Sequence, residues 1–517
     1  MKQRLQRIMG GLLLLCLLAG GGFGCRSEEE MEPADNPVEQ GDTQDHKDSI
    51  VIATMSETPS LSPTGHNSVA GNYMNLLTYS TLFRIDMQMT PQPHLCQSYE
   101  TMSDTKWRFT LHQGVRFHDG TELTARDVKA SLEWAKGFPE VKQYTDSIQS
   151  VEVVDDHTIE ITTPEPSAVL LNDLATHATA IVPKHLIDNG NDFNKNPVGS
   201  GPYRFTNWVL GDRLEFEAFA DYFAGEPPIS HMTWKIIPKG AERTVALESG
   251  EVDFIVEVET MDAQRLRENG GVQVLEFLST GPNWLMLNNE SPGLDNVNVR
   301  KAIDCAIDKE EVIRQALDGM GEVATSQTPF NLPGASDENA EPHSLQRAKT
   351  YMSRSGVSPS AVQMSIICSS EAKRRAAEVI QQDLGQIGIR CGIESMDLAT
   401  YLATTTEGNY TAAIGGYTPS TMIGYMTAVL HSKSIGSTNK TRLSDPALDA
   451  LIDKAAVTVD QVEREELLRQ ASARANDLCT QVPLYQAVEL RAYNSGLSGV
   501  EVNPSGQLYF EYVSWNI

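Results

Sequence analysis

The chain has 517 residues, of which 40% are hydrophobic, and a formal net charge of -28 at neutral pH. This excess of acidic groups would repel a phosphate backbone, so the composition argues against nucleic acid as a partner. No second long apolar run follows the first 25 residues, which excludes an integral membrane protein with several spans. About 470 residues remain beyond position 48, enough for two or three globular lobes.

The N-terminus predicts an export signal followed by a lipid anchor. It begins with the cationic segment MKQRLQR and continues with IMGGLLLLCLLAGGGFG, whose apolar part of about 15 residues is too short to span a membrane comfortably. The residues before Cys25 resemble a bacterial lipoprotein cleavage box, although Gly22 stands where that box usually has leucine. We therefore expect residues 1–25 to be a lipoprotein signal peptide with lipidation at Cys25. The alternative is simple secretion with an unmodified thiol.

Residues 26–48 predict a disordered acidic tether. The segment has nine acidic residues against two basic ones and almost no apolar side chains. Such a segment cannot bury enough surface to offset the entropy lost on ordering. We expect it to hold a globular body at the extracytoplasmic face of the cell membrane, close to a partner in that membrane.

The stretch GVRFHDGTELTARDV, residues 114–128, predicts a turn and a capped helix rather than a catalytic site. His118 and Asp119 precede Gly120 in a tight-turn signal, and Thr124 and Asp127 have the spacing of a capping box. A catalytic histidine needs a neighbouring nucleophile in a cleft, and this local pattern has none. The strand expected just before the turn alternates three apolar side chains on one face: Trp107, Phe109 and Leu111.

Strands and helices alternate in two later blocks, which predicts two α/β lobes. Residues 362–394 have the length of one strand–helix–strand unit, and helices are expected near 446–457 and 461–478. The last forty residues look extended, so we expect the chain to return to the first lobe and cross between the lobes twice. Cys368 and Cys391 end and begin two expected strands. A disulfide between them is one alternative, and two buried thiols are the favoured one.

A series of motifs resembles family 5 of the extracellular solute-binding proteins, the dipeptide-, oligopeptide- and nickel-binding components of ABC importers. The motifs follow the family's order and span residues 49–517: YSTLFRIDMQMTPQPHLCQSYE, WRFTLHQGVRFHDGTELTARDV, NPVGSGPYRF, DYFAGEPP, ALESGEVDF and VNVRKAIDCAIDKEEV. The resemblance implies an α/β, bilobed periplasmic-binding-protein-like (type II) fold with an extra inserted domain and a two-strand hinge.

The resemblance also implies a domain division. The first lobe, domain I, would comprise residues 49–80, 197–283 and 485–517. The inserted domain would be residues 81–196, and the second lobe residues 284–484. The ligand would lie between the two lobes, and closure of the lobes around it would be what the permease recognises.

The implied function is that of the substrate-binding subunit of an ABC importer, not of an enzyme, and no cofactor is implied. We expect a monomer that binds a small molecule or short peptide and hands it to permease and ATPase subunits, because the chain has no G-x-x-x-x-G-K-[ST] motif of its own. The S-x-x-K tetrad that begins at Ser103 lies in an expected turn, whereas acyl-transfer enzymes carry it on a helix. The alternatives are a binding protein for a blocked peptide, oligosaccharide or nickel chelate, or a sensory lipoprotein that presents its ligand to a receptor.

Position-by-position comparison with the family implies eight ligand-binding candidates. They are Glu57, Thr58 and Ser60 at a cleft edge, Asn283 and Trp284 at a lobe crossing, and Gly416, Tyr417 and Thr418 in the second lobe. In peptide-binding relatives this last segment normally carries an aspartate that anchors the ligand's ammonium, but here no acid occurs between Glu407 and Asp445. An unpaired ammonium in a closed cleft costs several kcal/mol. Either another acid such as Glu57 substitutes, or the ligand has no free amino terminus.

Two further groups of residues have the composition of a possible site. Four basic residues could meet an anionic ligand but more often form a solvated loop: His431, Lys433, Lys440 and Arg442. No metal site is expected, because His112 and His118 are six residues apart across a strand and a turn, and no CxxC pair occurs.

Overall fold

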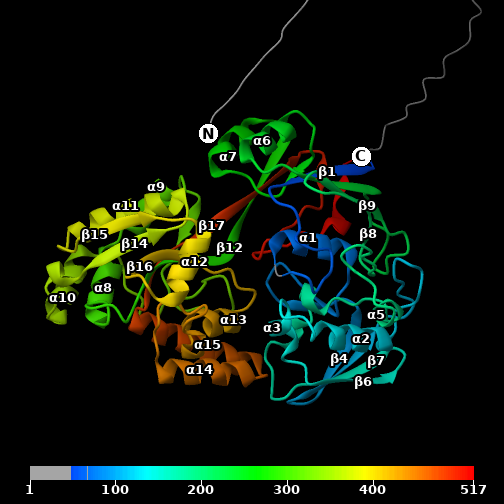
Figure 1. The fold of residues 1–517 in the computed structure, drawn as a ribbon, viewed down its shortest axis with the longest axis horizontal. Helices are drawn as coiled ribbons and strands as arrows, with labels where there is room; N and C mark the ends of the chain where they lie inside the picture. The colour runs from blue at the N-terminus through cyan, green and yellow to red at the C-terminus, as the bar shows by residue number, and fades with distance from the viewer. Residues whose placement is uncertain (1–47, 67, 517) are drawn as a thin grey trace, which may run out of the picture. The chain divides into compact units, whose positions relative to one another are not determined.

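The structure is a computed structural model that describes residues 48–66 and 68–516 (Figure 1). The expected signal peptide, Cys25 and all but the last residue of the expected tether lie outside these residues. Within the described part of the chain, every helix is too short or too polar to cross a membrane.

One sheet of eleven strands runs through both halves of residues 48–516, in the order β15-β14-β16-β12-β17-β11-β1-β10-β9-β8, with β13 also paired to β17. One half contains β1 (Ser49–Thr54), β8 (Tyr203–Val209), β9 (Arg213–Ala218), β10 (His231–Ile236) and β11 (Phe254–Ile255). The other contains β13 (Gly321–Val323), β14 (Met364–Cys368), β15 (Cys391–Ser395) and β16 (Ala412–Gly416). The long strands β12 (Val272–Leu287) and β17 (Gln481–Asn494) belong to both halves.

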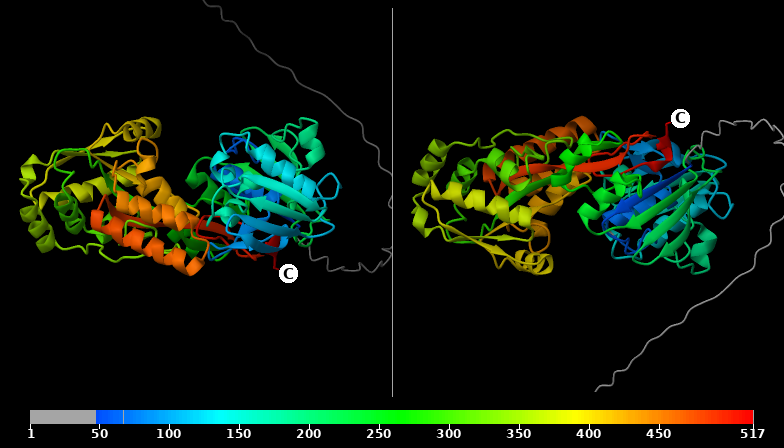
Figure 2. Two further views of the ribbon diagram at one scale, coloured as in Figure 1. Left: turned by 90° about the horizontal axis from the view of Figure 1, so that it is seen from below. Right: turned by 90° about the horizontal axis from the view of Figure 1, so that it is seen from above.

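Strands β12 and β17 are the two crossings that the sequence predicts, and Figure 2 shows them running from one half to the other. Their antiparallel ladder runs from Val272 to Leu278, shifts register, and resumes at Pro282. Within this break, Thr280 donates its amide to the Pro504 carbonyl at 3.0 Å instead of to the partner strand. A break of this kind lets paired strands bend, so it is the natural place for a hinge.

The segment between α1 (Val69–Thr78) and β8 contains a separate four-stranded antiparallel sheet in the order β4-β5-β7-β6. Its strands are β4 (Cys96–Ser103), β5 (Lys106–Leu111), β6 (Ser150–Asp155) and β7 (Thr158–Thr162). A small hairpin precedes it, β2 (Phe83–Ile85) with β3 (Pro91–Pro93). The helices of this segment are α2 (Ala125–Ala135), α3 (Lys142–Thr145), α4 (Leu170–Asp173), η1 (His177–Thr179) and α5 (Lys184–Asp188).

The turn and capped helix after β5 are confirmed. Gly120 has a φ of 85°, and α2 begins after Thr124, whose amide donates to the Asp127 carboxylate at 2.9 Å. The buried His118 ring donates through Nε2 to the Gly201 carbonyl at 3.0 Å, and burial lowers its pKa to about 4. His118 is therefore a neutral structural residue. The three apolar side chains of β5 are buried as predicted: Trp107, Phe109 and Leu111.

The second block of helices also follows the expectations. The strand–helix–strand unit is β14, α11 (Glu371–Gly385) and β15, with the two strands parallel. The two later helices are α14 (Pro446–Val457) and α15 (Gln461–Leu478). The block also contains α8 (Val297–Ala306), α9 (Lys309–Ala316), α10 (Leu345–Ser355), α12 (Leu398–Glu407) and α13 (Met422–Tyr425), while α6 (Gly240–Glu248) and α7 (Thr260–Glu268) precede β12.

The alternative of a disulfide between Cys368 and Cys391 is wrong. The parallel register sets Cys391 beside Met364 and Cys368 beside Ser395, so the two thiols lie at opposite ends of the paired strands. Both are free; Cys368 is buried and Cys391 half-buried.

Candidate functional site

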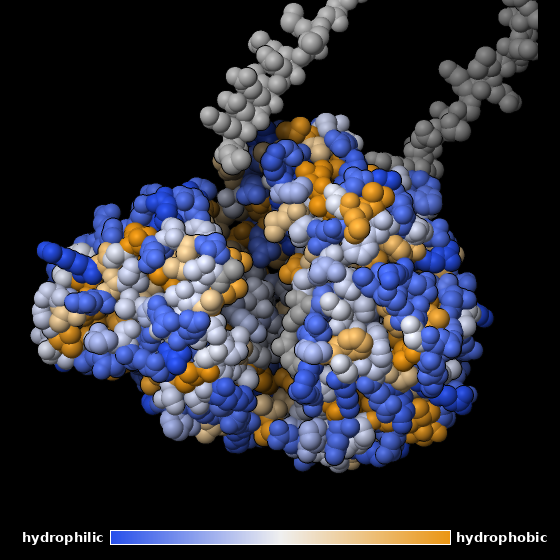
Figure 3. Space-filling view, viewed as in Figure 1, coloured by the Kyte–Doolittle hydropathy of each residue, from blue (hydrophilic) through white to orange (hydrophobic). Residues whose placement is uncertain are grey.

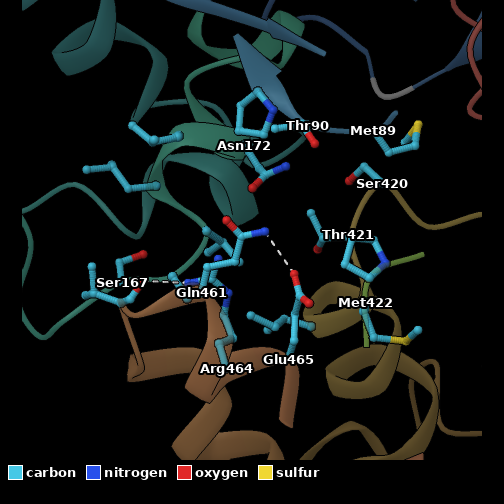
Figure 4. A pocket seen from close by; sticks show the side chains of 18 of the residues that line it. Met89, Thr90, Ser167, Asn172, Ser420, Thr421, Met422, Gln461, Arg464 and Glu465 are labelled. Carbon is cyan, nitrogen blue, oxygen red and sulfur yellow. Dashed lines mark hydrogen bonds between the residues drawn. The ribbon is translucent and has the colours of Figure 1, made fainter. Parts of the chain in front are cut away.

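Three adjoining cavities lie between the segment of residues 68–177 and the second half of the chain. The first has a volume of about 670 Å³ and is lined by parts of residues 144–176 and 417–457. The second, of about 320 Å³, lies between residues 167–172 and α15, and Figure 4 shows it from close by. The third, of about 250 Å³, is bounded by α1, η1 and Tyr509. Ser420 lines all three, so we treat them as one space and call it the interlobe hollow.

The surface view shows a neutral depression between the two halves, bordered by strongly polar side chains (Figure 3). A concave region that is reached from both halves is the usual form of a site for a small solute.

Tyr417 and Thr418 lie in the interlobe hollow. β16 ends at Gly416, and the Tyr417 amide then donates to the Pro282 carbonyl at 3.4 Å, which turns the chain along the hollow. Tyr417 borders the first cavity with a relative exposure of 36%, and Thr418 borders the first and third cavities. The segment that follows contributes hydroxyl groups but no charge.

Asn283, Trp284 and Gly416 lie beside this segment but are not among the residues that line the hollow. Asn283 pairs with Gly416 across β12 and β16, and a Cβ atom at position 416 would lie 2.7 Å from Asn283 Oδ1. Trp284 is only 3% exposed and packs edge-on against Tyr425, with ring centroids 5.8 Å apart. These three residues pack beside the segment that lines the hollow. Direct contact between them and a ligand stays a prediction.

Glu57, Thr58 and Ser60 are not brought together with Tyr417 and Thr418. Glu57 accepts hydrogen bonds from Trp208 Nε1 at 2.6 Å and from the Gly211 amide at 2.9 Å. With Thr58 it borders a separate surface hollow. Thr58 donates to the Ser60 carbonyl at 2.7 Å, and Ser60 is buried. A ligand role for these three residues remains a prediction.

The basic residues near position 431 are already paired within the fold. His431 lies 3.3 Å from Asp449 and 3.1 Å from Asp453, and Lys433 lies 3.7 Å from Asp453. Arg442 pairs with Glu290 at 2.6 Å, and Lys440 donates to the Thr406 hydroxyl. These contacts favour the structural interpretation, although Lys433 also borders the first cavity.

The hollow also contains residues that no sequence motif indicates. From the inserted segment come Ser147, Asn172, Asp173, Thr176 and His177, and from α15 come Gln461, Arg464 and Glu465. They lie in polar stretches that look like ordinary surface until folding sets residues 144–177 against 417–468. No local pattern could have identified them.

Two of these groups have strongly shifted pKa values. Burial raises the pKa of Asp173 to about 7, although a hydrogen bond from Ser147 acts in the other direction. Burial lowers the pKa of His177 to about 4, so this imidazole is neutral, and its Nε2 donates to the His66 carbonyl at 3.1 Å. The described residues contain no group of three histidine, cysteine or acidic side chains placed to hold a metal ion.

Residues 90–436 match the family of bacterial extracellular solute-binding proteins, family 5 middle. The chain belongs to this family. Among its relatives, heme-binding protein A of Haemophilus influenzae is 27% identical over 459 residues, which cover 82% of this chain and 84% of that protein. The glutathione-binding protein GsiB of Salmonella typhi is 27% identical over 480 residues, which cover 89% of this chain and 93% of that protein.

Solved structures show the same fold. HbpA2 from Haemophilus parasuis superimposes with a TM-score of 0.83 at 24% identity, and the match covers 91% of this chain and 100% of that chain. DppA from Helicobacter pylori, in complex with the peptide STSA, superimposes with a TM-score of 0.74 at 24% identity, and the match covers 91% of this chain and 98% of that chain. The predicted bilobed α/β fold of type II is therefore confirmed, and the chain is a family 5 solute-binding protein.

Proposed function

We propose that this family 5 protein is the substrate-binding subunit of an ABC importer and captures a peptide or peptide-like solute in the interlobe hollow. One observation carries the proposal: residues from both halves of the chain line a single space. The two strands that cross between these halves break their register, which permits a hinge. The names of relatives support it, since DppA is described as ABC transporter-associated and GsiB as glutathione-binding. Binding, not catalysis, is the task of such a subunit.

The rest of the proposal concerns where the protein works. A lipid on Cys25 and the acidic segment of residues 26–48 would keep the protein at the extracytoplasmic face of the membrane, beside the permease and ATPase subunits. We propose that it acts as a monomer, with the division into lobe 1, inserted domain and lobe 2 given above. The separate sheet β4-β5-β7-β6 supports treating residues 81–196 as a domain.

Thermal melting with a ligand panel tests the proposal. The panel contains glutathione, the dipeptide Met-Leu, trialanine, a nickel–histidine chelate, heme and an oligosaccharide. A ligand present at 100 times its dissociation constant should stabilise the folded state by about 2.7 kcal/mol. A shift with any peptide or glutathione supports the proposal. If only heme, the chelate or the sugar shifts the transition, the peptide assignment is wrong.

A further inference from the structure

The interlobe hollow has to hold a ligand although the second-lobe segment of residues 417–421 brings no acid to it. Three acidic side chains border the first cavity from the inserted segment: Asp146, Glu165 and Asp173. Glu165 is exposed. The Asp146 side chain is 58% exposed, and its carboxylate forms an ion pair with Lys142. Asp173 differs from both in burial and in partners.

Asp173 is the last residue of α4, and its position is fixed. Its Oδ2 accepts a hydrogen bond from the Ser147 hydroxyl at 2.7 Å, and its backbone carbonyl accepts from Thr176 and Thr179 at 2.8 and 2.9 Å. Within residues 48–66 and 68–516, no lysine, arginine or histidine side chain forms an ion pair with it. The structure thus holds a carboxylate at the hollow with one neutral hydrogen bond and no counter-ion.

Asp173 is half-buried, and its carboxylate charge has no cationic partner among the described residues. Removing it from water is costly unless it takes up a proton or gains a cationic partner, and burial accordingly raises its pKa to about 7. A primary ammonium offers three N–H donors in a compact charge and can pair with the carboxylate oxygen that Ser147 leaves open. The facing segment offers the hydroxyls of Thr418, Ser420 and Thr421, which suit a neutral peptide group.

We propose that Asp173 is the specificity-determining residue that receives the free amino group of the ligand, from the inserted domain instead of the second lobe. The inference rests on the proposed function and narrows it to solutes with a free cationic amine. Ser147 acts as a positioning residue, because its hydroxyl donates to the carboxylate and orients it.

The test compares free and N-acetylated ligands by isothermal titration calorimetry. Glutathione, Met-Leu and trialanine are each titrated, free and N-acetylated, into the wild type, Asp173→Asn and Asp146→Asn. Asparagine keeps the size and the acceptor for Ser147 but loses the charge, and Asp146→Asn removes a charge from the same cavity at an exposed position. We expect free ligands to bind the wild type at least about tenfold more tightly than acetylated ones, and Asp173→Asn to lose that preference while Asp146→Asn keeps it.

The outcomes separate this inference from the proposed function. If the wild type binds free ligands and Asp173→Asn binds them equally well, Asp173 is not the anchor, while the proposed function stands. If the wild type binds neither free nor acetylated peptides, both are wrong. Should Asp173→Asn fail to fold, Ser147→Ala replaces it: a smaller loss of affinity, confined to free amines, supports the inference, and an unchanged preference overturns it.

Discussion

Neutralising Asp173 should stabilise the ligand-free protein above neutral pH, a result that needs no knowledge of the ligand. The folded state raises the pKa of this carboxyl from 3.8 to about 7. An acid whose pKa is raised by folding contributes stability that is fully present below its unfolded value and lost as the pH rises through the folded value. The wild type therefore loses stability between about pH 4 and pH 7 through this group, and Asp173→Asn does not.

The size of the effect follows from the shift. About three pKa units correspond to about 4 kcal/mol at most. The carboxylate borders a cavity and relaxation lowers the cost of its charge, so about 2 kcal/mol is the realistic difference. For a folded body of about 470 residues, whose unfolding entropy is about 1 kcal/mol/K, that difference moves the melting temperature by about 2 °C.

The assay is unfolding by heat or urea across pH 4 to 8, in matched buffers without ligand. The other titratable groups at the hollow remain in both proteins and cancel in the difference. They include Tyr144, Asp146, Glu165, His177, Tyr417, Lys433, Arg464 and Glu465. We expect Asp173→Asn and the wild type to be equally stable near pH 4, with the variant more stable by about 2 kcal/mol at pH 8. A constant difference at all pH values, or a less stable variant at pH 8, would refute the claim that Asp173 is partly removed from water without a counter-ion.

Three further substitutions test other parts of the structure. Glu57→Gln should leave the affinity for free peptides unchanged and cost about 1 kcal/mol of stability, because the carboxylate serves Trp208 rather than the hollow; a large loss of affinity by calorimetry would restore Glu57 as the anchor. Asp127→Ala should lower the free energy of unfolding by about 1–3 kcal/mol in urea titrations, because it removes a helix cap and the acceptor for the Lys184 amide. Arg464 donates to two carbonyls and forms no ion pair with a carboxylate in the described part of the chain. Arg464→Gln should therefore lower the affinity for peptides with a free carboxyl terminus about tenfold more than the affinity for C-terminal amides. Equal losses of affinity for both kinds of peptide would contradict this.

The elements that the sequence predicted correctly are those whose signals are local. Alternation of apolar residues gives β5, and the cap formed by Thr124 and Asp127 gives the start of α2, because both patterns depend on neighbours a few positions apart. Helices α14 and α15 were predicted with their bounds for the same reason. The relation of Cys368 to Cys391 depends on strand register, which no local pattern specifies. The alternative of a disulfide between them is therefore wrong although their spacing in the sequence allows it.

The candidate site was only partly predictable. Tyr417 and Thr418 were found by their place in the family pattern, and the structure does set them in the hollow. Glu57 is a candidate because its segment corresponds to a cleft edge in the family, but its carboxylate accepts hydrogen bonds from Trp208 and from a backbone amide. Asp173 was missed because its burial is produced by packing of the inserted segment against residues far along the chain. A carboxylate's environment, unlike its identity, cannot be obtained from the sequence alone.

The position of the acid changes how binding would drive closure. An ammonium held by Asp173 would be paired on the inserted-domain side before the second lobe arrives, so the ionic contact would favour the bound state without distinguishing open from closed. Only contacts that form on closure can shift that equilibrium. On the second lobe these are the neutral hydroxyls around Ser420 and the ring of Tyr417. The contact that determines affinity and the contacts that drive closure would thus come from opposite sides of the hollow. Asp173→Asn should therefore lower the affinity for peptides, whereas a peptide that is bound should still close the two lobes as it does in the wild type.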